Sequence, residues 1–163
     1  MRILAFESSA KAASVAILSD GQLLGEAYLH SGLTHSRTLL QLARDLMASC
    51  GLGAGDIDAV ACAAGPGSFT GVRIGVAAAK GFAWGRELPC YGVSTLGSMA
   101  RQLGGVWNGI LCAAMDARRS QVYNALFLCQ RGTITRLCPD RAVSIAELEQ
   151  DLLARGGPIL LVG

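Results

Sequence analysis

The spacing of hydrophobic and polar residues predicts strands and helices that alternate along the chain. Short apolar runs bounded by glycine, proline or polar residues are typical of strands, whereas apolar residues recurring three and four positions apart are typical of helices. Strands are expected over residues 3–6, 14–18, 23–29, 57–63, 90–93, 110–115, 121–128, 133–137 and 158–162. Helices are expected from a cap at Thr34 or Ser36 to Cys50, over 72–84 and 95–103, and from a capping box at 144–147 to Gly156.

The first three strands come before any helix. Asp20 and Gly21 join the second strand to the third, and both residues tolerate the positive φ that a two-residue hairpin demands. Three strands that pair antiparallel, followed by helical crossovers, open a ribonuclease H-like lobe, the unit that is repeated in the actin-like ATPases. The sequence therefore predicts an α/β protein of the actin-like ATPase (ASKHA) fold, with a complete first lobe over 1–104 and a partial second lobe over 105–163. Because an apolar strand is expected at the very end of the chain, with nothing after it to cover it, we expect the natural protein to be longer.

Composition narrows the class of partner. Hydrophobic residues make up 52% of the chain and charged residues 16%, against roughly 25% charged in a typical soluble domain. A chain this apolar is not disordered, and no uncharged stretch reaches the roughly 18 apolar residues of a membrane span. The net charge of +2 is too small to indicate a polyanion-binding surface. Surplus apolar residues at low charge indicate a surface that another protein covers.

The N-terminus and the cysteines both indicate the cytoplasm. Only four apolar residues stand between Arg2 and Glu7, far fewer than a secretory signal peptide needs. The six cysteines form no Cys-x-x-Cys pair and most lie inside apolar runs, which is typical of buried, reduced thiols. His30 and His35 lie five residues apart without further metal ligands in a recognised spacing, so neither a metal nor a cofactor is expected.

The stretch from Gly65 to Gly75 joins an expected buried strand to an expected helix through closely spaced glycines. Such a loop presents backbone N–H groups at a helix N-terminus, where partial positive charge favours an anion. Its spacing matches neither the dinucleotide-binding pattern nor the P-loop, so anion binding and a structural tight turn both stay open. The candidate anion-binding residues are Gly65, Gly67 and Ser68, with Glu7 and Ser9 after the first strand.

The helix after this loop carries a row of small residues, namely Gly71, Gly75, Ala78 and Ala79. Such a row lets another backbone approach closely, and a glycine inside a helix costs roughly 1 kcal/mol relative to alanine, so a compensating contact is expected. That contact is either the protein's own sheet or a helix of a second subunit, and both alternatives stay open. Phe82 and Trp84 are candidate aromatic anchors of such a subunit interface, and for Phe82 a place in the core is an equally good alternative.

Catalytic patterns are sparse. Ser68 and His35 have the residue types of a serine-histidine-acid triad, but Ser68 lacks the Gly-x-Ser-x-Gly elbow and no acid is identifiable to orient His35. Arg118 and Arg119 follow Asp116 at the end of an expected strand, where they either grip a carboxylate or phosphate or stand in a solvated loop. No catalytic residue is assigned from these patterns.

Five motifs carry a resemblance that runs from residue 1 to about residue 128. They are Ile3-Leu4-Ala5 with Glu7-Ser8-Ser9, Leu33-Thr34-His35-Ser36-Arg37-Thr38-Leu39-Leu40, the string from Gly65 to Gly75, Gly92-Val93-Ser94-Thr95-Leu96, and Met115-Asp116-Ala117-Arg118-Arg119. Together they resemble the TsaB (YeaZ) family of bacterial tRNA threonylcarbamoyladenosine biosynthesis proteins, a glycoprotease-like branch of the actin-fold superfamily. Two departures stand out: many relatives have Asp at Glu7, and Gly-Glu where Ser120-Gln121 stand here.

The resemblance implies a non-catalytic role. TsaB is similar to TsaD, which transfers threonylcarbamoyl to tRNA and holds a metal with a His-x-x-x-His pair that this sequence lacks. In the family, TsaB pairs with TsaD through first-lobe helices, the ATPase TsaE joins that pair, and TsaB alone often forms a homodimer. The resemblance therefore implies a scaffold for TsaD that meets tRNA only indirectly. The implied interface residues are Ser36, Leu39, Leu40, Ala43, Gly71, Val72, Gly75, Ala78, Ala79 and Phe82.

The alternative is a nucleotide-binding phosphotransferase or hydrolase of the actin-like superfamily, or a glycoprotease. A nucleotide site needs both lobes, paired metal-binding carboxylates and a second phosphate loop, and Glu7 is the one visible candidate. Direct tRNA binding is disfavoured, because Lys11 and Lys80 are the only lysines and the arginines are scattered.

Overall fold

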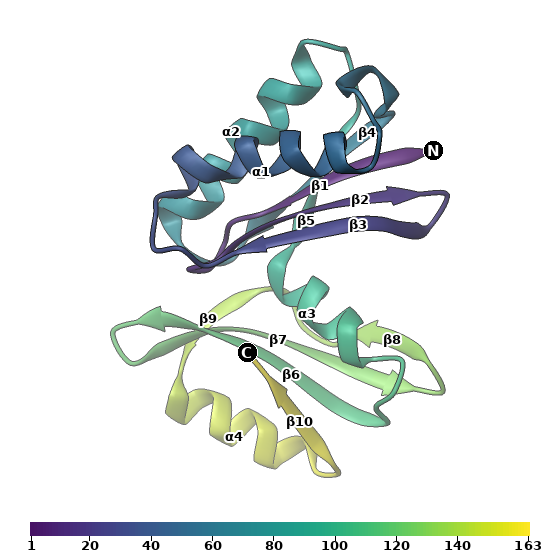
Figure 1. Cartoon of the computed structure of the whole chain (residues 1–163). Coiled ribbons are helices and arrows are strands. Elements are labelled where there is room, and N and C mark those ends of the chain that lie inside the picture. The colour runs from purple at the N-terminus through teal and green to yellow at the C-terminus, as the bar shows by residue number, and fades with distance from the viewer. The chain divides into compact units, whose positions relative to one another are not determined.

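The computed structural model describes residues 1–163 and divides them into two compact units (Figure 1). The first unit is Met1–Val93 and the second is Ser94–Gly163. The division between these two compact units falls after Val93, because the helix over 95–103 buries Leu96 and Ala100 in the core of the second unit. The lobe boundary that the sequence places after residue 104 stays a prediction.

The first unit is built on a five-stranded sheet in the order β3-β2-β1-β4-β5. Its strands are β1 (Arg2–Glu7), β2 (Ala13–Ser19), β3 (Gln22–Leu29), β4 (Ala59–Gly65) and β5 (Cys90–Ser94). Its helices are α1 (His35–Ser49) and α2 (Phe69–Trp84), with a single 3-10 turn, η1 (Ala54–Asp56), before β4. β1, β2 and β3 pair antiparallel and β4 joins β1 in parallel, which confirms the predicted opening of three strands followed by a helical crossover.

Alternation along the strands places the core of this unit on one face of its sheet. Leu4 and Phe6 of β1 and Val15 and Ile17 of β2 are buried in one cluster. Both helices contribute to the same cluster, α1 through Leu39 among others, and Figure 1 shows α1 and α2 on the same side of the sheet. The residues that follow β1 and the glycine loop before α2 make up the candidate site.

The second unit has a sheet in the order β10-β6-β7-β8, with β9 paired to β7. Its strands are β6 (Gly109–Arg118), β7 (Gln121–Gln130), β8 (Thr133–Arg136), β9 (Arg141–Ser144) and β10 (Ile159–Val162), and its helices are α3 (Thr95–Leu103) and α4 (Ile145–Arg155). Leu111 and Phe127 pack with α3, whereas Cys112 and Leu126 pack with Leu148 of α4. Because neighbouring residues of one strand point to opposite faces, each face of this sheet has its own helix.

The sequence located every α-helix and every strand except β9. That strand is four residues long and carries Arg141 and Ser144, so it has no apolar run, and it forms by pairing with β7. α2 begins at Phe69, earlier than predicted, because the Ser68 hydroxyl accepts the N–H of Gly71 at 3.2 Å and caps the helix there. None of the helices has both the length and the apolar character needed to cross a lipid bilayer.

Candidate functional site

The glycine loop packs onto the residues that follow β1. The N–H of Ser68 donates to the carbonyl of Ser9 at 2.7 Å, and the Ser8 hydroxyl donates to the carbonyl of Gly71 at 2.9 Å. Both Ser8 and Ser9 are buried. Residues nearly sixty positions apart in sequence are therefore held together by hydrogen bonds where the glycine loop enters α2.

Glycine is required where this loop and α2 meet β1. A Cβ at Gly67 would lie 2.5 Å from the carbonyl oxygen of Ser9, and one at Gly71 would lie 2.1 Å from that of Ser8. A Cβ at Gly75 would lie 2.3 Å from the Ser8 hydroxyl oxygen. Of the two explanations for the small residues of this helix, close approach to the protein's own sheet thus applies to Gly71 and Gly75.

The predicted anion-binding residues Glu7, Ser9, Gly65, Gly67 and Ser68 come together in this region. Several of their polar groups are bonded within the chain: the Glu7 carboxylate accepts the N–H of Ser9 at 2.5 Å, and Ser68 both caps α2 and donates to Ser9. These bonds are those of a satisfied turn at the end of β1. Only Ser68 among the five also lines the pocket beside the loop.

That pocket has a volume of about 330 Å³. It lies between the segment after β1, the β3–α1 loop and the first turn of α2, and Leu33 and Ile74 supply its apolar wall. Its remaining lining residues are Lys11, His30, Gly32, Thr34, His35, Ser68, Thr70 and Gly71. This pocket could not be predicted from the sequence, because its basic and hydroxyl residues come from three separate segments and form no motif.

The residues expected at a subunit interface differ in exposure. Leu39, Ala43, Gly71, Gly75 and Ala79 are buried inside the first unit. Val72, Ala78 and Phe82 are half-buried, while Ser36 and Leu40 are exposed. The five buried residues therefore pack α1 and α2 against the first unit. Other residues form the exposed surface of these two helices.

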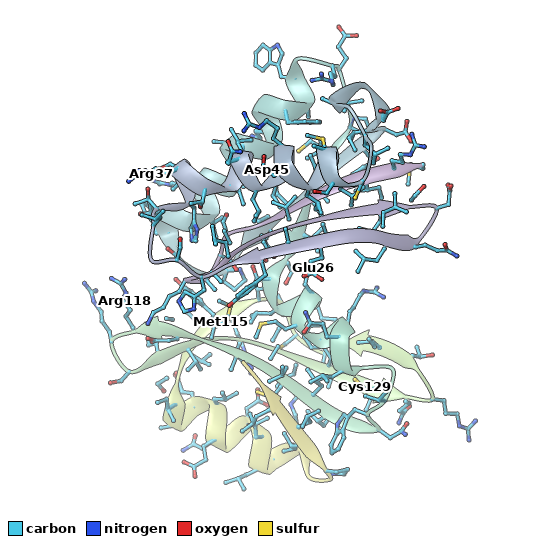
Figure 2. The ribbon with its side chains drawn as sticks, in the orientation of Figure 1. Glu26, Arg37, Asp45, Met115, Arg118 and Cys129 are labelled. Atoms are coloured by element: carbon cyan, nitrogen blue, oxygen red, sulfur yellow. The ribbon has the colours of Figure 1, made fainter.

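Two aromatic side chains dominate the exposed surface of α2. Phe69 is 70% exposed at the start of the helix and Trp84 is 86% exposed at its end. The guanidinium of Arg73 lies 3.6 Å from the centre of the Phe69 ring, a cation–π contact. On α1, the exposed residues include Leu40 and the charged side chains of Arg37 and Asp45 (Figure 2). Trp84 was a predicted anchor, whereas Phe69 was missed because it stood within the glycine motif.

Ser68 and His35, the residue types of a triad that the sequence analysis disfavoured, each have other hydrogen-bond partners. His35 Nε2 lies 2.9 Å from the carbonyl oxygen of Ala10, and the Ser68 hydroxyl is bonded to the start of α2. Although both residues line the pocket, no hydrogen bond joins them. No group of three or more His, Cys, Asp or Glu side chains is arranged to hold a metal ion.

All six cysteines are free thiols. Cys62, Cys112 and Cys129 are buried as expected, and burial raises the pKa of each of these thiols, which keeps them protonated and poorly nucleophilic. Cys50 and Cys138 are half-buried, and Cys90 is exposed on β5, the strand at the edge of its sheet.

Arg118 and Arg119 stand at the tip of the hairpin between β6 and β7, where Figure 2 labels Arg118. Both are exposed, and the N–H of Arg118 donates to the Asp116 carboxylate at 2.7 Å. Arg118, Arg119 and Ser120 all have positive φ, at 66°, 52° and 60°. The tip is thus a left-handed turn made entirely of non-glycine residues.

The strand order of the first unit, with antiparallel strands β3-β2-β1 and a parallel crossover to β4, defines the class as an α/β protein of the actin-like ATPase fold. The family model for "TsaD: tRNA N6-adenosine threonylcarbamoyltransferase" matches residues 30–160. The TsaB protein of Bacillus subtilis (strain 168) is 32% identical over 163 residues, which cover the whole of this chain and 71% of that protein. The chain belongs to the TsaB (YeaZ) family, a relative of TsaD.

Two further comparisons agree. The TsaB protein of Escherichia coli (strain K12) is 44% identical over 127 residues, covering 76% of this chain and 53% of that protein. The solved structure of YeaZ from Pseudomonas aeruginosa superposes with a TM-score of 0.78 at 31% identity, covering 87% of this chain and 66% of that one. The chain thus spans between about half and about seven-tenths of the length of these relatives.

Proposed function

We propose that this chain is a non-catalytic scaffold subunit of tRNA threonylcarbamoyladenosine biosynthesis that binds and stabilises TsaD. Relatives from Bacillus subtilis and Escherichia coli are named for that biosynthesis, and the matching family model is that of TsaD itself. In this proposal TsaE joins through the TsaB–TsaD pair, the chain alone forms a homodimer, and tRNA is met only through TsaD. Its place of action is the cytoplasm.

The observation that carries the proposal is the group of exposed apolar side chains on α1 and α2. Leu40, Phe69 and Trp84 stand on the two helices that pack against each other over one face of the first sheet. Exposed aromatic side chains are typical anchors of protein interfaces, where they fill pockets on the partner. We define Ser36, Leu40, Phe69 and Trp84 as the α1–α2 outer face and propose that it meets TsaD, with Val72, Ala78 and Phe82 at its margin.

The test is binding of the 163-residue chain to TsaD from the same organism, measured by sedimentation velocity and titration calorimetry. Trp84→Glu places a charge on the outer face, and Val106→Glu is its matched control, because Val106 is 83% exposed but lies outside α1 and α2. Leu40→Asp is paired in the same way with Leu153→Asp, an exposed leucine of α4. Loss of a buried anchor at an interface costs about tenfold or more in affinity.

We expect Trp84→Glu and Leu40→Asp to weaken TsaD binding at least about tenfold, and the two controls to leave it unchanged. Equal affinities for all four variants would move the interface away from α1 and α2. A chain that ignores TsaD altogether would contradict the scaffold role.

A further inference from the structure

Two of the free thiols lie on neighbouring strands of the first sheet. Cys62 is on β4 and Cys90 is the first residue of β5, and these strands are adjacent in the sheet. Both cysteines belong to the first unit, Met1–Val93. Cys62 is buried in the core cluster to which α1 and α2 contribute, whereas Cys90 is exposed. The sheet therefore carries an accessible thiol on the strand next to a protected one.

The pairing of β4 with β5 is fixed by two contacts. The N–H of Val60 donates to the carbonyl of Pro89 at 2.9 Å, just before β5 begins. Further along, a Cβ at Gly92 would lie 3.1 Å from the Cβ of Ala64. The neighbour on β4 thus advances as the chain advances along β5, so the two strands run parallel and approach each other closely.

The two cysteines occupy the equivalent position one step earlier along both strands. Cys62 stands two residues before Ala64, Cys90 stands two residues before Gly92, and side chains two residues apart in a strand point to the same face. A hydrogen bond between the two thiols adds to the effect of burial in raising the pKa of Cys62. A disulfide needs Cβ atoms about 3.5 to 4.5 Å apart, a separation that strands approaching this closely provide.

We propose that Cys62 and Cys90 form a reversible disulfide when the chain meets hydrogen peroxide. The Cys90 thiolate attacks one peroxide oxygen, the O–O bond breaks, and the departing hydroxide takes up a proton to become water, which leaves Cys90 as a sulfenic acid. The Cys62 sulfur then attacks the Cys90 sulfur, the S–O bond breaks, and the hydroxide leaves with the Cys62 proton as a second water. The two sulfur atoms lose two electrons and the peroxide gains them.

Exposure decides which thiol reacts first. Oxidation favours an accessible thiol, which is Cys90, over Cys62, which is buried and whose pKa is raised. Cys62 reacts second, because its sulfur already lies beside the sulfenic acid. The disulfide closes a ring over residues 62–90, which contains the glycine loop and the whole of α2. Such a bond is transient in a reducing compartment, and its formation does not depend on TsaD binding.

The test follows the thiols of the 163-residue chain. The chain would be treated with hydrogen peroxide, its remaining thiols blocked with N-ethylmaleimide in denaturant, and its unreduced tryptic peptides analysed by mass spectrometry. Cys90 is the one cysteine of the peptide 87–101, whereas Cys62 shares the peptide 45–73 with Cys50. Cys50→Ser is therefore the variant that assigns the bond, and Cys90→Ser is the variant that removes it.

We expect the oxidised chain to lose two of its six thiols and to yield the peptide 45–73 linked to 87–101, in the wild type and in Cys50→Ser alike. Dithiothreitol should restore both thiols. In Cys90→Ser no such link should form, and Cys62 should be labelled by the maleimide.

Two results would overturn the inference. Oxidation of Cys90 to a sulfinic acid, with Cys62 still labelled by the maleimide, would show that the two thiols do not reach each other. A link from Cys90 to any other cysteine, including one that disappears in Cys50→Ser or one that joins two copies of the chain, would show that the pairing of β4 and β5 does not select the partner.

Discussion

At the scale of single residues, Gly71 shows how a close contact fixes an amino acid. A Cβ at this position would lie 2.1 Å from a carbonyl oxygen of the backbone, which cannot move without moving the end of β1. From the sequence alone, the small residues of α2 fitted the protein's own sheet and a second subunit equally well, because both contacts need the same small side chains. Only the packing distinguishes the two explanations at Gly71 and Gly75.

Gly71→Ala should therefore destabilise the protein by about 1 to 3 kcal/mol, the usual cost of forcing extra atoms into a packed site. Gly81→Ala is the matched control, because Gly81 lies in the same helix and a Cβ added there would meet no other atom within 4 Å. That control should gain roughly 0.5 to 1 kcal/mol from the higher helix propensity of alanine. Urea unfolding followed by circular dichroism measures both, and a shift of the same sign in the two variants would contradict this account.

A substitution at Ser120 should stabilise the protein instead of destabilising it. Its φ of 60° lies in the left-handed region, where a side chain is unfavourable and glycine is not. Ser120→Gly should raise the free energy of unfolding by about 0.5 to 1 kcal/mol. Ser49→Gly, in the last turn of α1, should lower it instead, because glycine is a poorer helix former than serine. Thermal unfolding of the two variants checks both signs, and a less stable Ser120→Gly would show that the serine makes a contact that outweighs its backbone strain.

At the scale of elements, one polar network joins three strands and a helix of the second unit. Asn124 of β7 is fully buried and donates to the carbonyl of Ala113 on β6 at 3.1 Å. Its side-chain oxygen accepts from Arg141 of β9, and Arg141 pairs with Asp151 of α4. The network thus fixes β9 and α4 to the central pair of strands by bonds that no hydrophobic pattern reveals.

This network makes the second unit sensitive to acid. The Arg141 guanidinium holds the pKa of the Asp151 carboxyl below its usual value. A carboxyl whose pKa is lower in the folded than in the unfolded state stabilises the fold above its unfolded pKa of ~4, and that contribution is lost as the pH falls through the folded value. Asp151→Asn should lower stability at pH 7 and lose less of it between ~pH 4 and lower pH than the wild type does. Urea unfolding at several pH values measures this, and parallel curves for the two proteins would contradict it.

The elements that the sequence predicted best are those whose own residues carry the signal. The helix over 95–103 was placed to the residue, since Ser94 caps it and its apolar residues repeat at helical spacing. The hairpin at Asp20-Gly21 followed from turn chemistry, and both residues do have positive φ. β9 was missed because its order comes from Asn124, Asp151 and β7, which lie elsewhere in the chain.

At the scale of the whole molecule, an apolar composition does not say where the apolar surface lies. The expectation that another protein covers part of this chain came from 52% hydrophobic and 16% charged residues. The structure assigns many of those residues to three buried clusters, one in the first unit and two in the second. Others stay exposed, among them Leu40, Phe69 and Trp84 on α1 and α2. The pocket could not be predicted either, because Lys11, His30 and Ser68 meet only after three segments have folded together.

The two sides of α2 also bear on how this segment tolerates substitution over evolutionary time. Gly71 and Gly75 face the end of β1: a side chain at Gly71 would meet a backbone oxygen and is excluded wherever this packing is kept, whereas one at Gly75 would meet the hydroxyl of Ser8. Phe69 and Trp84 face outward, so they are free to drift unless a partner selects them. A saturation library of α2 therefore separates two kinds of selection: solubility alone restricts the inner positions, and cell growth that needs the assembled complex restricts the outer ones as well.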